Sequence, residues 1–183
     1  MVKKEWRYNK IRTMDISNGP GVRVSLFTQG CLHMCKDCFN EETWDFDLGN
    51  IWNDEVNNNI LNYMEKDYVE GLSILGGDPF AYYNDTISEI YDDDDKLYKL
   101  VKTAKKHFPE KNIWLWTGYR WEEFTRCDDS FSNKVKKVLP YIDVIVDGKF
   151  MKEFYDSSLL YRGSKNQRVL NVQKLLTELS FSK

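Results

Sequence analysis

The sequence has little of what marks a membrane, secreted or nucleic-acid-binding protein. None of its apolar runs approaches the about 20 residues that a membrane-spanning helix needs. Residues 1–7 are basic, but no apolar stretch follows them, so no secretory signal is predicted. The formal net charge is −3 and the two signs are interspersed, which provides no basic stripe for nucleic acid. We therefore expect a cytoplasmic protein with neither a membrane nor a nucleic-acid partner.

Cysteine is also scarce, and three of the four cysteines lie within eight residues. A disulfide framework is not favoured, because such frameworks belong to short secreted chains. Cys31, Cys35 and Cys38 instead follow the C-x3-C-x2-C spacing of metal ligands. Cys127 has no neighbouring cysteine, and we interpret it as an ordinary thiol on a helix or loop.

The three clustered cysteines predict a 4Fe–4S cluster with one iron left open. A cubane cluster normally takes four thiolates, so three thiolates reserve the fourth iron for an exchangeable ligand. The alternative is a structural zinc site, with His33 or Cys127 as its fourth ligand. A zinc-stabilised interaction module would be colourless and non-catalytic, whereas an iron–sulfur protein is brown.

Length and hydrophobic pattern predict a single α/β domain over residues 1–183. Four short apolar segments bounded by turn residues predict strands, at residues 23–28, 71–75, 112–116 and 142–146. Apolar residues at helical spacing lie between them, at 52–64 and 97–104. This alternation predicts a parallel sheet, either a partial (β/α) barrel or an open sheet. The core is expected at about residues 8–168, with a short strand and helix in a C-terminal tail at 169–183.

Polar and glycine-rich segments follow each predicted strand. They are the cysteine loop, Gly76-Gly77-Asp78-Pro79, Thr117-Gly118-Tyr119 and Asp147-Gly148-Lys149. Ligands of parallel α/β proteins bind at the carboxyl ends of the strands, so we expect these segments to converge on one site. The glycine pair would let the backbone approach a ligand where a Cβ atom would clash.

Several of these segments resemble those of one family. Residues 18–23 and 26–40 look like the start of an anaerobic ribonucleoside-triphosphate reductase-activating protein of the radical S-adenosylmethionine superfamily. Residues 113–119, 143–149 and the Arg-Gly-Ser-x-Asn-Gln-Arg segment of residues 162–168 occur in the order of that family. The resemblance extends from about Tyr8 to Arg168 and implies a radical-SAM-like fold.

The resemblance also implies a chemistry and a set of site residues. A 4Fe–4S cluster on the three clustered cysteines would cleave S-adenosylmethionine reductively, and the resulting radical would generate a glycyl radical on the reductase. An electron donor protein would be the second partner, and no catalytic residue beyond cluster and cofactor is implied. The implied cofactor-binding residues are Asp37, Cys38, Phe39, Gly76, Gly77, Asp78, Trp116, Thr117, Gly118 and Asp147. Asp147 is expected to accept a bond from a hydroxyl group.

Three positions depart from the usual patterns. Asp37 stands where many relatives carry an aromatic residue that stacks on adenine, and Phe39 stands where the family usually has Tyr. Asp78 replaces the Glu of most of the superfamily but matches the family's own Gly-Gly-Asp-Pro.

The sequence leaves the protein partner partly open. The chain is short for enclosing a small substrate, which favours an open face and a protein substrate. Trp44, Phe46, Tyr82 and Tyr83 are interpreted either as docking residues for the glycine-bearing loop or as core residues. Residues 162–168 carry donors suited to carboxylates or backbone, without an assigned role. An activase of a different glycyl-radical enzyme is the second alternative.

A run of four aspartates, residues 92–95, is expected to be solvated and non-helical. Its last residue, Asp95, is predicted to cap a helix that begins near Lys96. The nearby cluster of Lys134, Lys136 and Lys137 is predicted to lie on a solvated helix face.

Overall fold

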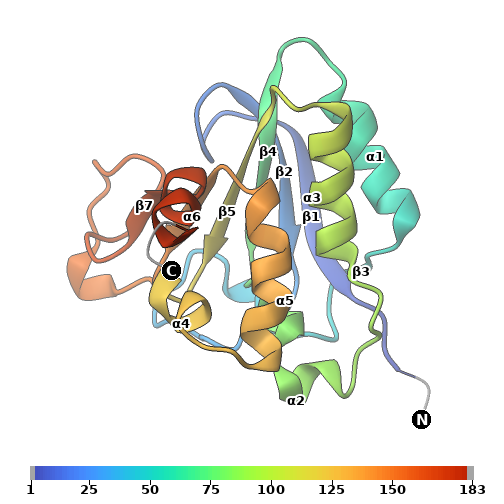
Figure 1. Cartoon of the computed structure of the whole chain (residues 1–183). Coiled ribbons are helices and arrows are strands. Elements are labelled where there is room, and N and C mark those ends of the chain that lie inside the picture. Colours follow the sequence, from blue (N-terminus) through green and yellow to red (C-terminus); the bar gives the residue numbers. More distant parts are fainter. Residues whose placement is uncertain (1–2, 181–183) are drawn as a thin grey trace.

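The computed structural model describes residues 3–180, which form one open sheet flanked by helices (Figure 1). Seven strands are present in this part of the chain, in the order β3-β1-β2-β4-β5-β6-β7. Their bounds are β1 Arg7–Asp15, β2 Val22–Thr28, β3 Asn50–Ile51, β4 Val69–Gly76, β5 Asn112–Thr117, β6 Val144–Asp147 and β7 Arg168–Asn171. The α-helices are α1 Asp54–Met64, α2 Asp85–Ser88, α3 Lys96–His107, α4 Trp121–Thr125, α5 Ser130–Val138 and α6 Val172–Ser180.

The sheet is mixed, which corrects the prediction of an open parallel sheet at its edges. The four central strands β2, β4, β5 and β6 are parallel, as predicted. The outer strands β1, β3 and β7 run antiparallel to their neighbours. The short connection of residues 16–21 joins β1 to β2 as a hairpin, because a parallel crossover needs a dozen or more residues. The sheet does not close, so the radical-SAM-like barrel stays a prediction.

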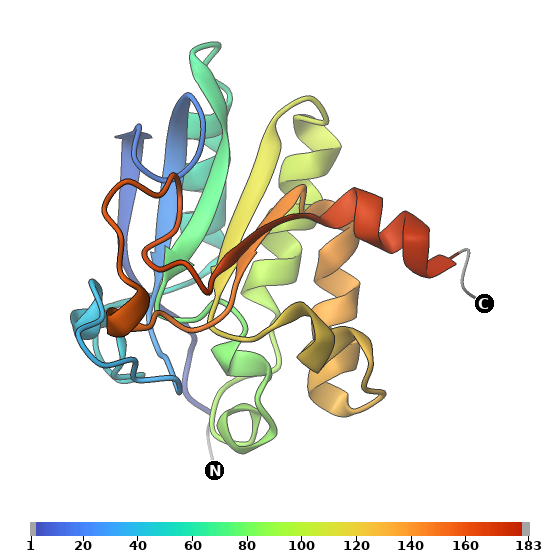
Figure 2. The same cartoon turned by 90° about the vertical axis from the view of Figure 1, so that its left-hand side faces the viewer.

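The two faces of the sheet are covered differently. Alternate strand residues such as Leu72, Ile74 and Leu115 are fully buried with the helices in the main core. Figure 2 shows the helices on one side and the segment between β6 and β7 across the other. On that second face, Trp116 Nε1 donates a 2.8 Å hydrogen bond to the carbonyl of Tyr161. This second face is therefore covered by the segment of residues 148–167, which contains none of the α-helices and which we call the roof.

Most predicted elements are present within a few residues. The helical spacing at 52–64 and 97–104 corresponds to α1 and α3, and the predicted tail contains β7 and α6. Lys134, Lys136 and Lys137 lie on α5. Strand β1 was not predicted from the sequence, because its polar residues are mostly half-buried and show no clear apolar alternation. None of the helices formed by residues 3–180 is long and apolar enough to cross a membrane.

Of the four aromatic residues interpreted as docking or core residues, Tyr82 and Tyr83 are buried, whereas Trp44 and Phe46 are half-buried. Tyr82 and Tyr83 are only 2% exposed and belong to the main core, so their docking interpretation is wrong. Trp6 stacks on Tyr82 with ring centroids 4.6 Å apart, and Phe46 contacts the same ring edge-on. Trp44 is half-buried beside the cysteine loop.

The acidic run caps α3 as predicted. The Asp95 carboxylate accepts a 2.9 Å hydrogen bond from the backbone N–H of Tyr98 and a 2.6 Å bond from the hydroxyl of Tyr83. Burial raises the pKa of Asp95 in spite of these two bonds. Asp93 lies on the surface instead, where it pairs with Lys3.

Asp95→Ala should lower the free energy of unfolding by about 1–2 kcal/mol, because the helix loses its N-cap and the buried Tyr83 hydroxyl loses its acceptor. Asp93→Ala is the matched control and should cost less than about 0.5 kcal/mol, since it removes only an exposed ion pair. Urea denaturation followed by circular dichroism measures both. Equal losses in the two variants would contradict the capping role.

Candidate functional site

The cysteine loop follows β2 and is held by the backbone of the chain beyond it. Cys31 N–H donates to the carbonyl of Trp44 at 3.0 Å, and Cys38 N–H donates to the carbonyl of Cys35 at 3.1 Å. Cys31 is buried, whereas Cys35 and Cys38 are half-buried. All three thiols line the same cavity of ≈ 330 Å³. Cys127 is exposed and far along the chain, as predicted.

The predicted convergence of strand ends occurs at this cavity. Its walls include Gly76, Gly77 and Asp78 after β4, and Trp116, Thr117 and Gly118 at the end of β5. Gly148 after β6 and Phe39 after the third cysteine also line it. Of the residues assigned to the cofactor, Asp37 and Asp147 do not line the cavity. Asp37 is exposed at a left-handed position with φ of 57°.

A segment that the sequence did not assign to the site forms the remaining wall. Phe150, Leu159, Tyr161, Arg162 and Gly163 all line the cavity from the roof over the helix-free face. The Phe39 ring is 65% exposed and lies 5.1 Å from the ring of Phe150. These residues have no strand-end position, so the rule that located the other segments could not find them.

The glycine pair is packed against the protein's own backbone. A Cβ atom on Gly77 would lie 2.4 Å from the carbonyl oxygen of Gly30. Gly76 has φ of +107°, and its Cβ would meet the backbone of Phe27 and Thr28. Glycine is therefore needed here for the approach of two chain segments. A role of the pair in holding a ligand stays a prediction.

Asp78 is 1% exposed and accepts bonds from several parts of the site. Its donors are the backbone N–H groups of Phe80 and Gly118, the Thr117 hydroxyl and the His33 ring. The carboxylate therefore joins the ends of β4 and β5 to the cysteine loop.

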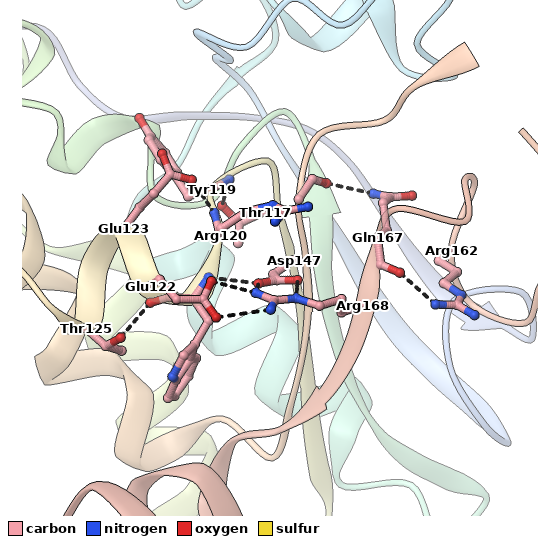
Figure 3. Close-up of polar contacts among 12 residues, drawn as sticks. Thr117, Tyr119, Arg120, Glu122, Glu123, Thr125, Asp147, Arg162, Gln167 and Arg168 are labelled. Carbon is pink, nitrogen blue, oxygen red and sulfur yellow. Dashed lines mark hydrogen bonds and ion pairs between the residues drawn. The ribbon is translucent and has the colours of Figure 1, made fainter. Parts of the chain in front are cut away.

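Asp147 is buried in an ion pair instead of facing the cavity (Figure 3). Arg168 Nε and Nη2 donate to its two carboxylate oxygens at 2.9 and 2.5 Å, and Trp121 N–H donates at 2.8 Å. The same guanidinium also bonds both oxygens of Glu122 and lowers the pKa of that carboxyl to about 2. These two carboxylates in turn raise the pKa of Arg168, with Asp147 contributing most. The expected hydroxyl-accepting role of Asp147 stays a prediction.

The rest of the 162–168 segment folds on itself. The Gln167 side-chain oxygen accepts from the N–H groups of Gly163 and Ser164, and its amide donates to the carbonyl of Gly148 at 3.0 Å. Arg162 Nη1 donates to the Gln167 carbonyl at 2.7 Å, as Figure 3 shows. The segment thereby ties the roof of the cavity to the end of β6.

Two of the three clustered thiols are harder to deprotonate than a free cysteine. Burial, followed by the nearby Asp78 charge, raises the pKa of Cys31 to about 12, and burial also raises the pKa of Cys35. Both therefore hold their protons at neutral pH until a metal displaces them. Within residues 3–180, no three His, Cys, Asp or Glu side chains are grouped closely enough to hold a metal ion, and this includes the three clustered cysteines.

Comparison with known proteins defines the class of this site. Residues 17–170 match the sequence model of the family described as a 4Fe-4S single cluster domain. The chain is 38% identical over 162 residues to the anaerobic ribonucleoside-triphosphate reductase-activating protein of Enterobacteria phage T4. The aligned region covers 88% of this chain and 92% of that protein. The same-named protein of Vibrio cholerae is 40% identical over 162 residues, or 87% and 94% of the two chains. That of Escherichia coli K12 is 35% identical over 164 residues, or 88% and 96%.

These matches place the chain in a particular family within that class. It belongs to the family of anaerobic ribonucleoside-triphosphate reductase-activating proteins, which confirms the resemblance found in the sequence.

Arg168→Met should destabilise the protein, because it leaves the Asp147 carboxylate buried without a cation. Removing one partner of a buried pair costs about 3–5 kcal/mol, and the 36% exposure of the Arg168 side chain puts the expected loss at the lower end. Lys165→Met, which removes an exposed ion pair with Asp156, should cost at most about 1 kcal/mol.

The double variant Arg168→Met/Asp147→Asn should recover part of the loss, because no buried charge remains. Chemical denaturation of the unaltered protein, the single variants Arg168→Met and Asp147→Asn, and the double variant measures the coupling. Additive losses in the double variant would show that Asp147 does not depend on Arg168.

Proposed function

We propose that the protein activates an anaerobic ribonucleoside-triphosphate reductase by radical chemistry at a 4Fe–4S cluster. The supporting observation is that the three spaced cysteines and the ends of β4, β5 and β6 line one cavity. Family membership supports the same partner, since the relatives are named as activating proteins of this reductase. The cluster and S-adenosylmethionine, when bound and supplied with an electron from a donor protein, would provide the reductive cleavage to methionine and a 5′-deoxyadenosyl group that removes a hydrogen atom from one glycine of the reductase.

The residues of this chain hold and orient the groups that react. Cys31, Cys35 and Cys38 would ligate the cluster, leaving one iron without a protein ligand. The wall formed by residues 76–78 and 116–118 would hold the cofactor opposite those thiols, which brings the reacting groups together as one bound unit. Trp116 and Phe39 offer ring surface at the cavity, where an aromatic base can stack. No side chain is needed to move a proton in this reaction.

The partners and location follow from the same chemistry. The cavity opens beside exposed apolar side chains, including Phe39, which is 65% exposed, and a protein substrate can reach it there. A reducing cytoplasm would keep the ligand cysteines as thiols, and it stays our expectation for the location.

Replacing Cys31, Cys35 or Cys38 by Ala should remove most of the iron bound after anaerobic reconstitution, because each thiolate holds one iron of the cluster. Cys127→Ala should keep iron and colour near those of the unaltered protein, since that thiol lies on the surface. Iron analysis and the broad absorbance near 400 nm measure the outcome. Full iron in all three single variants would refute the ligand assignment, and stoichiometric zinc without iron would favour the zinc alternative.

The activation itself can be tested with the complete chain, S-adenosylmethionine, a strong reductant and an anaerobic reductase, all without oxygen. We expect equal amounts of 5′-deoxyadenosine and methionine, and an electron paramagnetic resonance doublet from a glycyl radical on the reductase. Absence of 5′-deoxyadenosine from an iron-loaded protein would overturn the proposed chemistry. A radical that forms only on a different glycyl-radical enzyme would keep the chemistry and replace the partner.

A further inference from the structure

The Asp78 carboxylate has no free acceptor site for a ligand. A carboxylate offers about four lone-pair positions. In this structure Oδ1 accepts from Phe80 N–H at 2.9 Å and from the Thr117 hydroxyl at 3.1 Å. Oδ2 accepts from Gly118 N–H at 2.8 Å, from the same hydroxyl at 2.9 Å and from His33 Nε2 at 2.9 Å. Asp78 is thus saturated by donors of the protein, although it lines the cavity.

His33 differs from the other donors because it comes from the cysteine loop. Phe80, Thr117 and Gly118 belong to the ends of β4 and β5, which the parallel sheet already holds together. The His33 side chain is 8% exposed and sits between Cys31 and Cys35 in sequence. Its bond to Asp78 therefore connects the wall that carries the thiols to the wall that carries the predicted cofactor contacts.

The surroundings of the His33 ring are shaped to hold it. The ring lies edge-on to Tyr119, with centroids 4.5 Å apart at 71°. A Cβ atom on Gly118 would come within 2.2 Å of His33 Cδ2, so residue 118 must be glycine for the ring to reach Asp78. The bond to Asp78, the Tyr119 ring and the space left by Gly118 together hold the imidazole in one orientation.

The loop itself lacks regular structure that would fix it. Residues 31–38 contain neither helix nor strand. Met34 and Asp37 both have positive φ, at 44° and 57°, which costs a non-glycine residue about 1–2 kcal/mol. A loop held in such a conformation needs contacts outside itself, and the His33–Asp78 bond is one of them.

We propose that His33 is a positioning residue, which through Asp78 sets the cysteine loop at a fixed distance from the residues 116–118 wall. This inference rests on the proposed function for the identity of the ligands. The Asp78 side chain then links the two walls, and contacts with the cofactor are left to the neighbouring backbone. His33 acts on the thiols' position and is not itself a metal ligand.

Three variants separate these roles. His33→Phe keeps a ring against Tyr119 but removes the donor, and His33→Gln restores an N–H near the position of Nε2. Leu32→Ala is the control, because Leu32 is a 42% exposed neighbour in the same loop.

The first measurement uses the metal-free protein and hydrogen–deuterium exchange. His33→Phe should speed exchange of the hydrogen-bonded amides of Gly118, Cys31 and Cys38 by at least about tenfold, because local opening becomes easier. His33→Gln and Leu32→Ala should stay within about threefold of the unaltered protein, and global unfolding should change little. Unchanged exchange in His33→Phe would overturn the link.

The second measurement uses the reconstituted protein. His33→Phe should retain its iron. It should bind S-adenosylmethionine at least about tenfold more weakly, which corresponds to a loss of about 1.4 kcal/mol in binding free energy. The change in the cluster's electron paramagnetic resonance signal on cofactor addition should also be smaller. His33→Gln should recover both. Loss of iron equal to that of the cysteine variants would make His33 a ligand and overturn the positioning role, as would unchanged affinity. If the unaltered protein binds the cofactor without releasing 5′-deoxyadenosine, the proposed function fails while both measurements still decide the role of His33.

Discussion

The site depends on the parallel pairing of β2 and β4, which stays in register to their last residues. Thr28 lies opposite Gly76, so the two chains leave the sheet side by side. Gly77 N–H then donates to the Thr28 carbonyl, and Asp78 N–H donates to the Gly30 carbonyl, both at 2.9 Å. A cysteine loop and a glycine turn that are far apart in sequence thereby become one hydrogen-bonded unit.

The parts of this arrangement that depend on local pattern could be predicted from the sequence. The four central strands are short apolar runs that end in glycine or polar residues, and parallel pairing places all their carboxyl ends at one edge. The Asp95 cap likewise follows from neighbouring residues alone. Strand β1 could not be found in this way, because most of its side chains are polar, its apolar residues do not alternate, and its pairing with β2 comes from the hairpin connection.

The side-chain partners of the site required the structure. Asp147 was assigned to a hydroxyl group because it follows a strand, yet Arg168, which pairs with it, becomes its neighbour only through the antiparallel return of β7. Tyr82 and Tyr83 follow the glycine turn in a short 3-10 helix, Ala81–Tyr83, and Trp6 and Phe80 pack against them in the core. The glycine residues likewise indicate a close contact but do not identify the group that makes it. It marks a close approach of backbone, and at Gly77 and Gly118 the approaching groups are Gly30 and His33 of the protein itself.

The same kind of contact holds the thiol-bearing loop against the rest of the protein. Cys31 is buried, which raises the pKa of its thiol, and the backbone bond from Cys31 to Trp44 fixes where its side chain begins. Ligation of a cluster requires the thiolate, so cluster binding would have to remove the thiol protons and replace them with iron. The cost of the two left-handed residues in the loop, Met34 and Asp37, is offset by contacts with the rest of the protein, such as the His33–Asp78 bond. Because the His33–Asp78 bond joins the two walls, a substitution in the wall opposite the thiols should shift the cysteine loop, and with it the position of the cluster ligands, even though no cysteine is replaced.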